Sequence, residues 1–385
     1  SLSQYKDQSR NFDQTTGLLK CWAGATQYSV MESVCPRGWV LPSIPGASGI
    51  TIGGMIAANA HGKNHYQNGS MGHHLLSMKV MLADGEVIKC SREREPDLFW
   101  ATLGGLGLTG IVIEAELQLC RINSVYASSN MMGFPGVDQL VDLIESHKSK
   151  YEYILGWANG HIMDNNVWRG AVSLGRNLGP DEVEEPWRLP ALEPFKLPFR
   201  NPLPIGRITA RVINSVIGRK FRDGKETVTD LLRFCFPQEI FSNWNIAFGP
   251  RGFIDYQCCI PQRNLSDCLK QVQKFLIESR LQCFMILFKR FGQPQREGHF
   301  SFPMEGFSFT VEAPIQKNIY GILNQLDEII VGFGGRVNPI KDSRVSPEML
   351  KRMYPNLEQW LAVKQKYDPT GKFCSDMSRR LGLTL

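Results

Sequence analysis

The 385-residue sequence lacks several features that mark specialised classes of protein. No apolar run approaches the roughly 18 residues that a membrane-spanning helix needs, so any membrane contact is expected to be peripheral. The opening residues, SLSQYKDQSRNFDQ, show neither the basic nor the apolar region of a signal peptide. The ten cysteines include no CxxC pair, which favours reduced thiols over a disulfide framework. We therefore expect a cytoplasmic or peripheral-membrane protein.

Charge of either sign is also moderate. A net charge of +6 with 43% hydrophobic and 21% charged residues is typical of an ordinary globular protein, and the length suggests two domains. The positive charge is concentrated in residues 188–225, where nine Lys/Arg accompany only Glu193 and Asp223. We expect a long loop there. It is either a solvated insertion or a docking face at an anionic membrane surface. Nucleic-acid binding is not expected, because no recognition fold or interleaved stacking aromatics are visible.

The pattern of apolar residues predicts an α+β protein. In residues 1 to about 122, HLLSMKVMLADGEVIKC predicts a hairpin with Asp84-Gly85 as its turn, and EREPDLFWATLGG predicts a helix before the strand GIVIEAELQLC. Further along, strands such as FIDYQCCIP, CFMILFKRFG and FSFTVEAPI alternate with helices such as LSDCLKQVQKFLIESRL. We expect PEMLKRMYPNLEQWLAVKQKYD to form one closing helix.

Four of the seven histidines lie in residues 59–74, NAHGKNHYQNGSMGHH. His61 and His65 have the spacing of a zinc-binding HExxH helix, but Gly62 stands where the catalytic Glu belongs, and the glycines argue against a helix. No Asp, Glu or Cys between positions 55 and 79 supplies a third ligand. We therefore predict no metal site. The alternatives are a solvated loop and a ligand-binding turn whose glycines expose backbone N–H groups.

The segment GLGLTG, residues 105–110, formally matches the GxGxxG dinucleotide fingerprint. That fingerprint needs a strand before it, a helix after it and an acidic residue about 20 positions later. Here a helix is predicted before it and a strand after it, and no acidic residue lies near position 130. We interpret these glycines as a tight turn or as a place where the backbone approaches a ligand closely.

Three segments resemble the flavin-binding core of the vanillyl-alcohol-oxidase-type FAD-linked oxidases: IPGASGITIGGMIAANAHGKNH, SMGHHLLSMKVMLADGE and FWATLGGLGLTGIV. Within that superfamily, the second half of the chain resembles the decaprenylphosphoryl-β-D-ribose oxidase family. The similar segments, in order, are WNIAFGPRGFIDYQCCIP, GGRVNPIKDSR, MYPNLEQW and DPTGKFCSDMSRRL. The resemblance implies a two-domain α+β flavoprotein. Residues 1–124 and 337–385 would form the FAD domain, and residues 125–336 an antiparallel-sheet substrate domain. Family members carry a glycine-rich FAD-binding loop before the equivalent of Ser1, so we expect the first FAD-binding subdomain to be missing here.

The resemblance implies FAD as the cofactor. We expect it to be bound non-covalently, although related oxidases can link a histidine at this turn to the flavin. The residues implied to contact FAD are Pro45, Gly46, Ala47, Thr51, Gly53, Gly54, Ala57, His61, Gly62, Lys63, Gly107, Thr109, Gly110, Ile111 and Asn338.

The resemblance also implies a reaction, the oxidation of a sugar secondary hydroxyl to a ketone. The expected substrate is a polyprenyl-phosphoryl ribose oxidised at C2, with a short-chain reductase partner completing an epimerisation to the arabinose donor. Lys341 in PIKDSR matches the family's active-site lysine. A buried, partly desolvated lysine there would accept the hydroxyl proton or polarise the oxygen. The catalytic candidates are Lys341, His61, Gln257 and Lys289; the substrate-binding candidates are Lys63, Cys235, Asp255, Gln257, Lys289, Ser308, Thr310 and Lys341.

Several of these positions depart from the family pattern. Asp255-Tyr256-Gln257 stands where the family has Gln-Tyr-Gln, and Ser308-Phe309-Thr310 where it has Asn-Ile-Cys. Cys235 replaces a tyrosine and Ile246 an arginine. The sequence therefore leaves the sugar and its lipid undecided. It also leaves two alternatives, an aldonolactone oxidase acting on a soluble lactone and a non-catalytic, flavin-free binding subunit.

Overall fold

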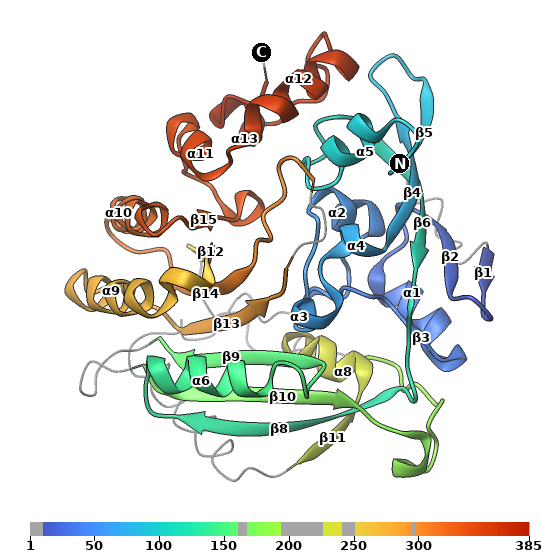
Figure 1. Ribbon diagram of the computed structural model, residues 1–385, viewed down its shortest axis with the longest axis vertical. Coiled ribbons are helices and arrows are strands. Elements are labelled where there is room, and N and C mark those ends of the chain that lie inside the picture. Colours follow the sequence, from blue (N-terminus) through green and yellow to red (C-terminus); the bar gives the residue numbers. More distant parts are fainter. Residues whose placement is uncertain (1–10, 161–167, 194–225, 241–250, 294–297, 385) are drawn as a thin grey trace.

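The computed structural model describes residues 11–160, 168–193, 226–240, 251–293 and 298–384. Its main elements are two antiparallel sheets and the helices packed on them (Figure 1). Within the described residues every strand pairing is antiparallel. The expected mixture of helices and antiparallel sheet is therefore confirmed.

The first sheet has five strands in the order β1-β2-β6-β4-β5. Its strands are β1 (Asn11–Asp13), β2 (Leu18–Trp22), β4 (Leu75–Met81), β5 (Val87–Ser91) and β6 (Ile111–Gln118). The predicted hairpin turn joins β4 to β5, and Gly85 there has a φ of +94°, which glycine adopts without strain. A separate two-stranded pairing joins β3 (Trp39–Val40) to β7 (Cys120–Arg121).

Short helices accompany this sheet: α1 (Gln27–Val34), the 3-10 helix η2 (Cys35–Arg37), α2 (Ile52–Ala57), α3 (His65–Asn68), α4 (Met71–His74) and α5 (Pro96–Thr102). The expectation of no helix in the histidine-rich stretch was wrong for α3 and α4. Each is a single turn, and α3 ends at Gly69, whose φ of +73° is not helical and is one that glycine adopts without strain. His61 lies before both.

The second sheet has eight strands in the order β11-β8-β10-β9-β13-β14-β12-β15. Their bounds are β8 (Tyr126–Phe134), β9 (Tyr153–Asn159), β10 (Gly170–Asn177), β11 (Thr227–Asp230), β12 (Phe253–Ile260), β13 (Met285–Phe291), β14 (Gly306–Pro314) and β15 (Arg336–Val337). The other short elements here are α8 (Leu231–Cys235) and the 3-10 helices η3 (Pro180–Glu182), η4 (Pro237–Ile240), η6 (Gln262–Asn264) and η7 (Pro339–Lys341).

One face of this sheet is covered by α6 (Val137–His147), α9 (Leu265–Glu278) and α10 (Ile319–Gly332). Figure 1 shows α9 and α10 on the side of the sheet away from the first sheet. Since side chains alternate between faces of a strand, every second residue enters the core under the helices. Those of β12 are Tyr256, Cys258 and Ile260, which are buried together with Phe307 and Phe309 of β14. The intervening residues point to the opposite face.

The C-terminal segment returns to the first sheet. It forms α11 (Pro347–Met353), α12 (Leu357–Tyr367) and α13 (Asp376–Arg380). Our expectation of a single closing helix was therefore wrong. Pro355 explains the break, because proline disfavours the helical conformation of the residue before it, and α11 ends at the C-cap Tyr354. The indole N–H of Trp360 on α12 donates to the carbonyl oxygen of Ala101 on α5 at 2.9 Å.

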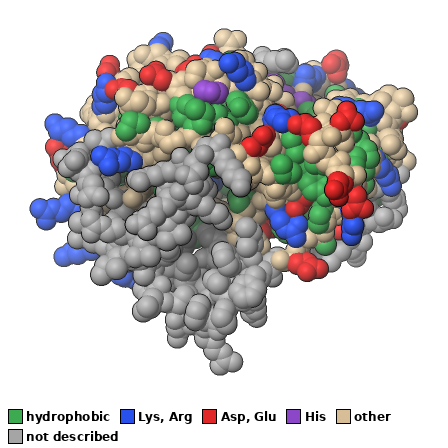
Figure 2. All heavy atoms as spheres, turned by 90° about the horizontal axis from the view of Figure 1, so that it is seen from below, with side chains coloured by type: hydrophobic (Ala, Val, Ile, Leu, Met, Phe, Trp, Pro, Cys, Tyr) green, Lys and Arg blue, Asp and Glu red, His purple; other side chains and the backbone are tan. Residues whose placement is uncertain are grey.

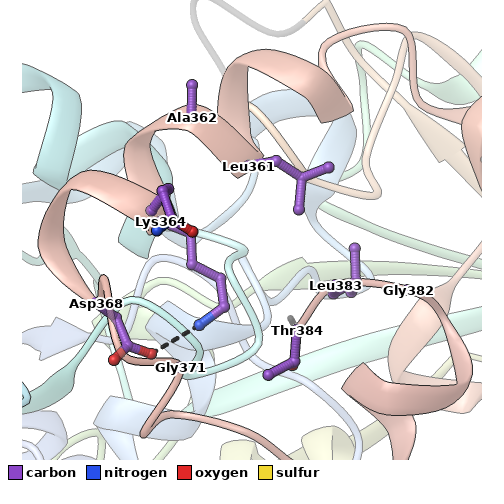
Figure 3. A pocket seen from close by; sticks show the side chains of 9 residues that line it. Leu361, Ala362, Lys364, Asp368, Gly371, Gly382, Leu383 and Thr384 are labelled. Carbon is purple, nitrogen blue, oxygen red and sulfur yellow. Dashed lines mark hydrogen bonds and ion pairs between the residues drawn. The ribbon is translucent and has the colours of Figure 1, made fainter.

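A buried lysine anchors this segment beside the GLGLTG turn. Lys364 Nζ donates to Asp368 Oδ2 at 2.8 Å, to the carbonyl of Leu108 at 3.0 Å and to that of Phe373 at 3.0 Å. Figure 3 shows the pair with Asp368 at the edge of a cavity of about 330 Å³ between α12 and the chain end. All three ammonium hydrogens have partners, so we assign Lys364 a structural role.

None of the ten cysteines forms a disulfide, as predicted. Among the described residues, no helix has both the length and the apolar character to cross a membrane. The basic segment 188–225 lies mostly outside the described residues. In its described neighbourhood, Arg176 and Arg188 pair with Glu182 and Glu185 at 2.6 and 2.7 Å. Figure 2, which views this end of the molecule from below, likewise shows acidic and basic side chains interspersed on its right side.

We predict that Lys364→Met lowers the free energy of unfolding by about 3–5 kcal/mol, because it leaves the buried Asp368 carboxylate without its cation. Urea unfolding followed by tryptophan fluorescence measures the change. Lys366→Met, two residues later on the exposed side of α12, is the control and should change stability by about 0.5 kcal/mol or less. Equal unfolding curves for the two variants would contradict the anchoring role.

Candidate active site

A row of polar side chains occupies the face of the second sheet that the helices leave uncovered. In the strand register Asp255 lies opposite Glu312, Gln257 opposite Thr310 and Lys289 opposite Ser308. All six residues therefore share one face of three neighbouring strands, β12, β14 and β13. Five predicted site residues are brought together in this way, and Glu312 joins them.

Gln257 connects this face to two other parts of the chain. Its Nε2 donates to Ser308 Oγ at 3.0 Å and lies 3.1 Å from His61 Nε2. Its Oε1 accepts from Asn338 Nδ2 at 2.9 Å, and its backbone carbonyl accepts from the Asn338 N–H at 2.9 Å. Asn338 is the N-cap of η7, which ends at Lys341. The predicted residues His61, Gln257, Ser308 and Asn338 thus form one hydrogen-bonded group.

His61 enters this group from the first part of the chain through an aromatic setting. Its ring centroid is 4.7 Å from that of Phe291 and 5.8 Å from that of Phe302. Burial, reinforced by the positive charge of Lys289, holds the imidazole pKa well below its usual range, so the ring is neutral. Its Nδ1 is buried and has no hydrogen-bond partner among the described residues. This atom is therefore available to a bound molecule.

The other three histidines of the stretch have structural partners. The His65 ring lies 4.2 Å from that of Phe291, and its Nδ1 accepts from the Gly292 N–H at 3.3 Å. His73 Nδ1 accepts from the Ser70 N–H at 3.1 Å, and His74 Nε2 lies 2.7 Å from the carbonyl oxygen of Asn68. Within the described residues, no group of three His, Cys, Asp or Glu is placed to hold a metal ion.

Three lysines lie around Gln257, and they differ in their partners and in their burial. Lys63 Nζ donates to the carbonyl of Phe234 at 2.7 Å and lies 4.7 Å from the centroid of that ring. Lys289 is half-buried, and desolvation, followed by the positive charges of Lys341 and Lys63, lowers its pKa to about 7. Lys341 forms an ion pair with Asp255.

The expectation that Lys341 is the buried lysine was wrong. Its side chain is 36% exposed, because it lies on the short helix η7 at the edge of the sheet rather than on a strand. The desolvated amine of the site is that of Lys289 on β13, which has the apolar side chains Leu287 and Phe291 on the same face of its strand. The two lysines that the sequence placed together therefore differ in their electrostatic environment.

Two segments expected to contact FAD lie side by side in the first part of the chain. The N–H groups of Gly104 and Leu106 donate to the carbonyls of Ile56 and Ala57, each at 2.9 Å. A Cβ added to Gly46 or Gly107 would meet no atom within 4 Å, so the backbone there faces open space. Gly107 also has a φ of +73°, which favours glycine. These exposed backbone segments fit a cofactor that the backbone contacts closely.

Other glycines of the predicted FAD set pack against protein instead. A Cβ on Gly62 would lie 2.8 Å from the Ile44 carbonyl oxygen, and one on Gly110 would lie 2.9 Å from that of Met81. A Cβ on Gly53 would come within 3.0 Å of Ala23 Cβ. These three glycines are needed for close packing of the chain. The sequence pattern alone does not distinguish glycines that are needed for such packing from glycines that contact a ligand.

The remaining predicted residues have varied positions. The Thr51 hydroxyl caps α2 by accepting from the Gly54 N–H at 3.2 Å, and the Thr109 hydroxyl is buried against that of Thr102 at 2.9 Å. The Pro45 carbonyl accepts from Gln27 Nε2 at 3.1 Å. Cys235, on α8 next to Phe234, is buried, and its thiol pKa is raised to about 12 by desolvation. It is therefore a neutral thiol beside Lys63. Ala47 is exposed, and Ile111 is 38% exposed.

Sequence reasoning missed Glu312, Phe291 and Phe302. Glu312 is buried, and desolvation together with the neighbouring Asp255 raises the pKa of its carboxyl to about 7. The alternation in FSFTVEAP would have revealed it, because Ser308, Thr310 and Glu312 are two residues apart and must share a face. Phe302 contacts His61 from a loop, and no sequence pattern indicates that contact.

We predict that His65 causes part of the loss of stability in acid. Its pKa is lowered to about 3 by burial, so the unfolded chain binds a proton below about pH 6.5 and the folded chain does not. Stability present at pH 7 is therefore lost as the pH falls towards 3, by about 2 kcal/mol from this residue between pH 7 and pH 5. In urea unfolding, His65→Asn should lose correspondingly less over this range, whereas the control His147→Asn, on α6, should match the unaltered protein. An unchanged pH dependence in His65→Asn would contradict this assignment.

Comparison with known proteins supports the flavin interpretation. The family model described as an FAD binding domain matches residues 1–91, and that of D-arabinono-1,4-lactone oxidase matches residues 310–381. Decaprenylphosphoryl-beta-D-ribose oxidase of Mycolicibacterium smegmatis is 32% identical over 384 residues, covering 97% of this chain and 82% of that protein. A Streptomyces coelicolor protein described as an uncharacterized protein in the mprA 5' region is 29% identical over 374 residues, covering 93% of this chain and all of that protein.

A shorter match is to D-arabinono-1,4-lactone oxidase of Eremothecium gossypii, which is 25% identical over 167 residues, or 43% of this chain and 30% of that protein. The long match to the M. smegmatis oxidase and the FAD-domain match agree with the exposed backbone segments described above. They set aside the alternative of a flavin-free binding subunit. The chain therefore belongs to the vanillyl-alcohol-oxidase-type family of FAD-linked oxidases, and it is an FAD-dependent oxidoreductase.

Proposed function

We propose that this chain oxidises a secondary hydroxyl of a sugar to a ketone, and that the substrate is a polyprenyl-phosphoryl ribose oxidised at C2. The observation that carries the proposal is that Lys341 from η7 and His61 from the first part of the chain converge on the sheet face that bears Gln257 and Lys289. It is supported by the M. smegmatis relative, a decaprenylphosphoryl-beta-D-ribose oxidase by name, which matches along nearly the whole chain. A short-chain reductase that reduces the ketone would complete an epimerisation.

The charges of the site suit an anionic substrate. The amines of Lys63, Lys289 and Lys341 lie near one another, and the nearby carboxylate paired with an amine is that of Asp255. Positive charge is therefore in excess, and the negative charge of a phosphodiester would compensate it, as anions do in sites with clustered lysines. A lipid phosphate also implies peripheral contact with a membrane. The basic segment proposed for that contact lies mostly outside the described residues.

The cofactor site would use backbone more than side chains. FAD supplies the acceptor for a hydride when it is bound. We propose that the exposed turns around Pro45, Gly46 and Ala47 and at Gly107 hold it non-covalently, and that Thr51, Gly54, Ala57, Lys63 and Asn338 lie beside it. His61 Nδ1, a buried atom without a hydrogen-bond partner among the described residues, would bond to the cofactor or the sugar.

The substrate side would be formed by the polar row on the second sheet. We propose that Gln257, Ser308 and Thr310 hydrogen-bond the sugar hydroxyls, and that Lys341 contacts the hydroxyl that reacts. Cys235 and Asp255 would shape the site where the family pattern differs. The division into residues 1–124, 125–336 and 337–385 is the domain arrangement that we propose for this site.

We predict that Lys341→Ala slows anaerobic bleaching of the flavin absorbance by polyprenyl-phosphoryl ribose by about 10²–10⁴-fold, the range of a lost acid-base or polarising group. Stopped-flow absorbance on protein with a full complement of FAD measures the rate. Lys351→Ala on exposed α11 is the control and should bleach at the normal rate. Normal bleaching in Lys341→Ala would remove Lys341 from the mechanism.

A second candidate function is oxidation of a soluble aldonolactone, favoured by the match of residues 310–381 to D-arabinono-1,4-lactone oxidase. Steady-state assays with the lactone in the absence of lipid distinguish the two. We expect bleaching by the lipid-linked ribose and little or none by D-arabinono-1,4-lactone. The opposite preference, with oxygen uptake, would decide for the lactone oxidase.

A further inference from the structure

The two lysines of the site differ in whether a carboxylate compensates their charge. Lys341 is ion-paired with Asp255 and is partly exposed, both of which favour the ammonium form. Within the described part of the chain, the Lys289 amine makes no ion pair and no hydrogen bond, although it is half-buried. A lysine that accepts a proton must first be neutral, and desolvation without a counter-charge favours the neutral amine.

We propose that Lys289 is the proton acceptor of this site, and that Lys341, held as an ammonium ion by Asp255, donates a hydrogen bond to the reacting hydroxyl oxygen. This assignment rests on the proposed sugar oxidation and gives the two lysines separate roles. Lys289 lies opposite Ser308, which is hydrogen-bonded to Gln257, which in turn contacts His61. The amine therefore belongs to the same face as the groups that would hold the sugar.

The proton and electron balance of the step is simple. The substrate O–H bond breaks, and its proton forms the fourth bond to nitrogen on neutral Lys289, giving an ammonium ion. The carbon–hydrogen bond breaks with transfer of the hydride to FAD, and the oxygen lone pair completes the C=O bond. The carbon is oxidised by two electrons and FAD is reduced by two. Lys341 keeps its proton throughout.

The charged and titratable groups around Lys289 agree with this assignment. The positive charges of Lys341 on η7 and Lys63 before α3 favour loss of its proton, whereas the negative charge of Asp255 on β12 opposes it. His61 and His65 also face it, and their own pKa values are lowered, first by burial, so both rings are neutral near pH 7. Glu312 on β14 shares this sheet face, and desolvation followed by the charge of Asp255 raises the pKa of its carboxyl to about 7. The net effect with desolvation is a pKa of about 7 for Lys289.

The first test measures the amines themselves in the full chain with bound FAD. Competitive acetylation across a pH series, followed by mass spectrometry of the two peptides, reports when each amine loses its proton. We expect Lys289 to become reactive near pH 7, and we expect the ion pair with Asp255 to protect the Lys341 amine from acetylation. The reverse order would overturn the proposal. This measurement does not depend on turnover, so it stays decisive even if the polyprenyl-phosphoryl ribose fails to reduce the flavin.

The second test follows the pH dependence of flavin reduction in anaerobic stopped flow. In the unaltered protein the rate should rise through about pH 7, because the neutral amine is the active form. Asp255→Asn removes an opposing negative charge and should move this rise to lower pH. Lys341→Met removes a positive charge that repels the Lys289 ammonium. Flavin reduction in this variant should be slow, and its rate should rise at a higher pH than in the unaltered protein. Lys289→Met should abolish the rise.

Different results would overturn the role of Lys289 and the proposed sugar oxidation. If neither charge variant moves the rise, or if Lys289→Met keeps it and Lys341→Met loses it, Lys289 is not the acceptor. A flavin that the sugar does not bleach at any pH in the unaltered protein would instead contradict the proposed function. Asp255 and Lys341 act on the carboxyl of Glu312 in the same directions, so Glu312→Gln separates the two groups. A rise near pH 7 that persists in Glu312→Gln assigns it to Lys289 even if Lys289→Met fails to fold, and a rise that disappears there would overturn the assignment.

Discussion

The hydrogen bonds of Gln257 hold the site together. This one side chain joins His61 from the first part of the chain, Ser308 from the neighbouring strand and Asn338 from the segment that leads to Lys341. A buried amide with unpaired groups costs about 1–3 kcal/mol, so the three partners constrain one another strongly. The position of His61 relative to the sheet, and of η7 relative to His61, depends on this amide. The strand register then sets where Lys289, Thr310 and Glu312 lie.

A second constraint fixes the segment that carries Lys341. Arg344 Nη2 donates to Asp327 Oδ1 at 2.8 Å, and the Tyr256 hydroxyl donates to the same oxygen at 2.9 Å. Tyr256 precedes Gln257 and points to the opposite face of β12, so both faces of that strand hold the segment after β15. A rigid frame of this kind is what a reaction between a bound cofactor and a sugar requires, because catalysis depends on the distance and orientation of the reacting atoms.

Electrostatics distinguishes groups that the sequence treats as equal. Two lysines from separate segments meet near one glutamine, but a carboxylate compensates the charge of Lys341 and leaves Lys289 without a partner in the described chain. The His61 ring is neutral, and burial favours the protonated, uncharged form of the Glu312 carboxyl. One site can therefore hold a cationic donor and a neutral amine together near neutral pH.

Much of the fold could be predicted from local patterns. The β4–β5 hairpin followed from Asp84-Gly85, and the strands β12, β13 and β14 followed from their apolar and β-branched residues. The break between α11 and α12 was missed although Pro355 marks it, because the apolar pattern continues on both sides. The helical turns α3 and α4 were missed because each is a single turn, too short for periodicity to reveal.

The residues of the site could be predicted, but their burial and their contacts with one another could not. The family resemblance indicated His61, Gln257, Lys289 and Lys341, yet the burial of Lys289 and the exposure of Lys341 arise from packing between segments far apart in sequence. The same holds for Gly53 and Gly110, whose role in close packing depends on which backbone lies opposite. Strand alternation alone would have added Glu312. No local rule would have placed Phe302 beside His61.

In the proposed reaction, hydride leaves C2 of a lipid-linked ribose at the site that Gln257 organises. The most direct measurement is the anaerobic rate of flavin reduction with polyprenyl-phosphoryl ribose that carries deuterium at C2 only. We expect a primary isotope effect with this substrate and none when deuterium is placed at C3. Equal rates with the C2-deuterated and unlabelled substrates, or an effect at C3 instead, would contradict it.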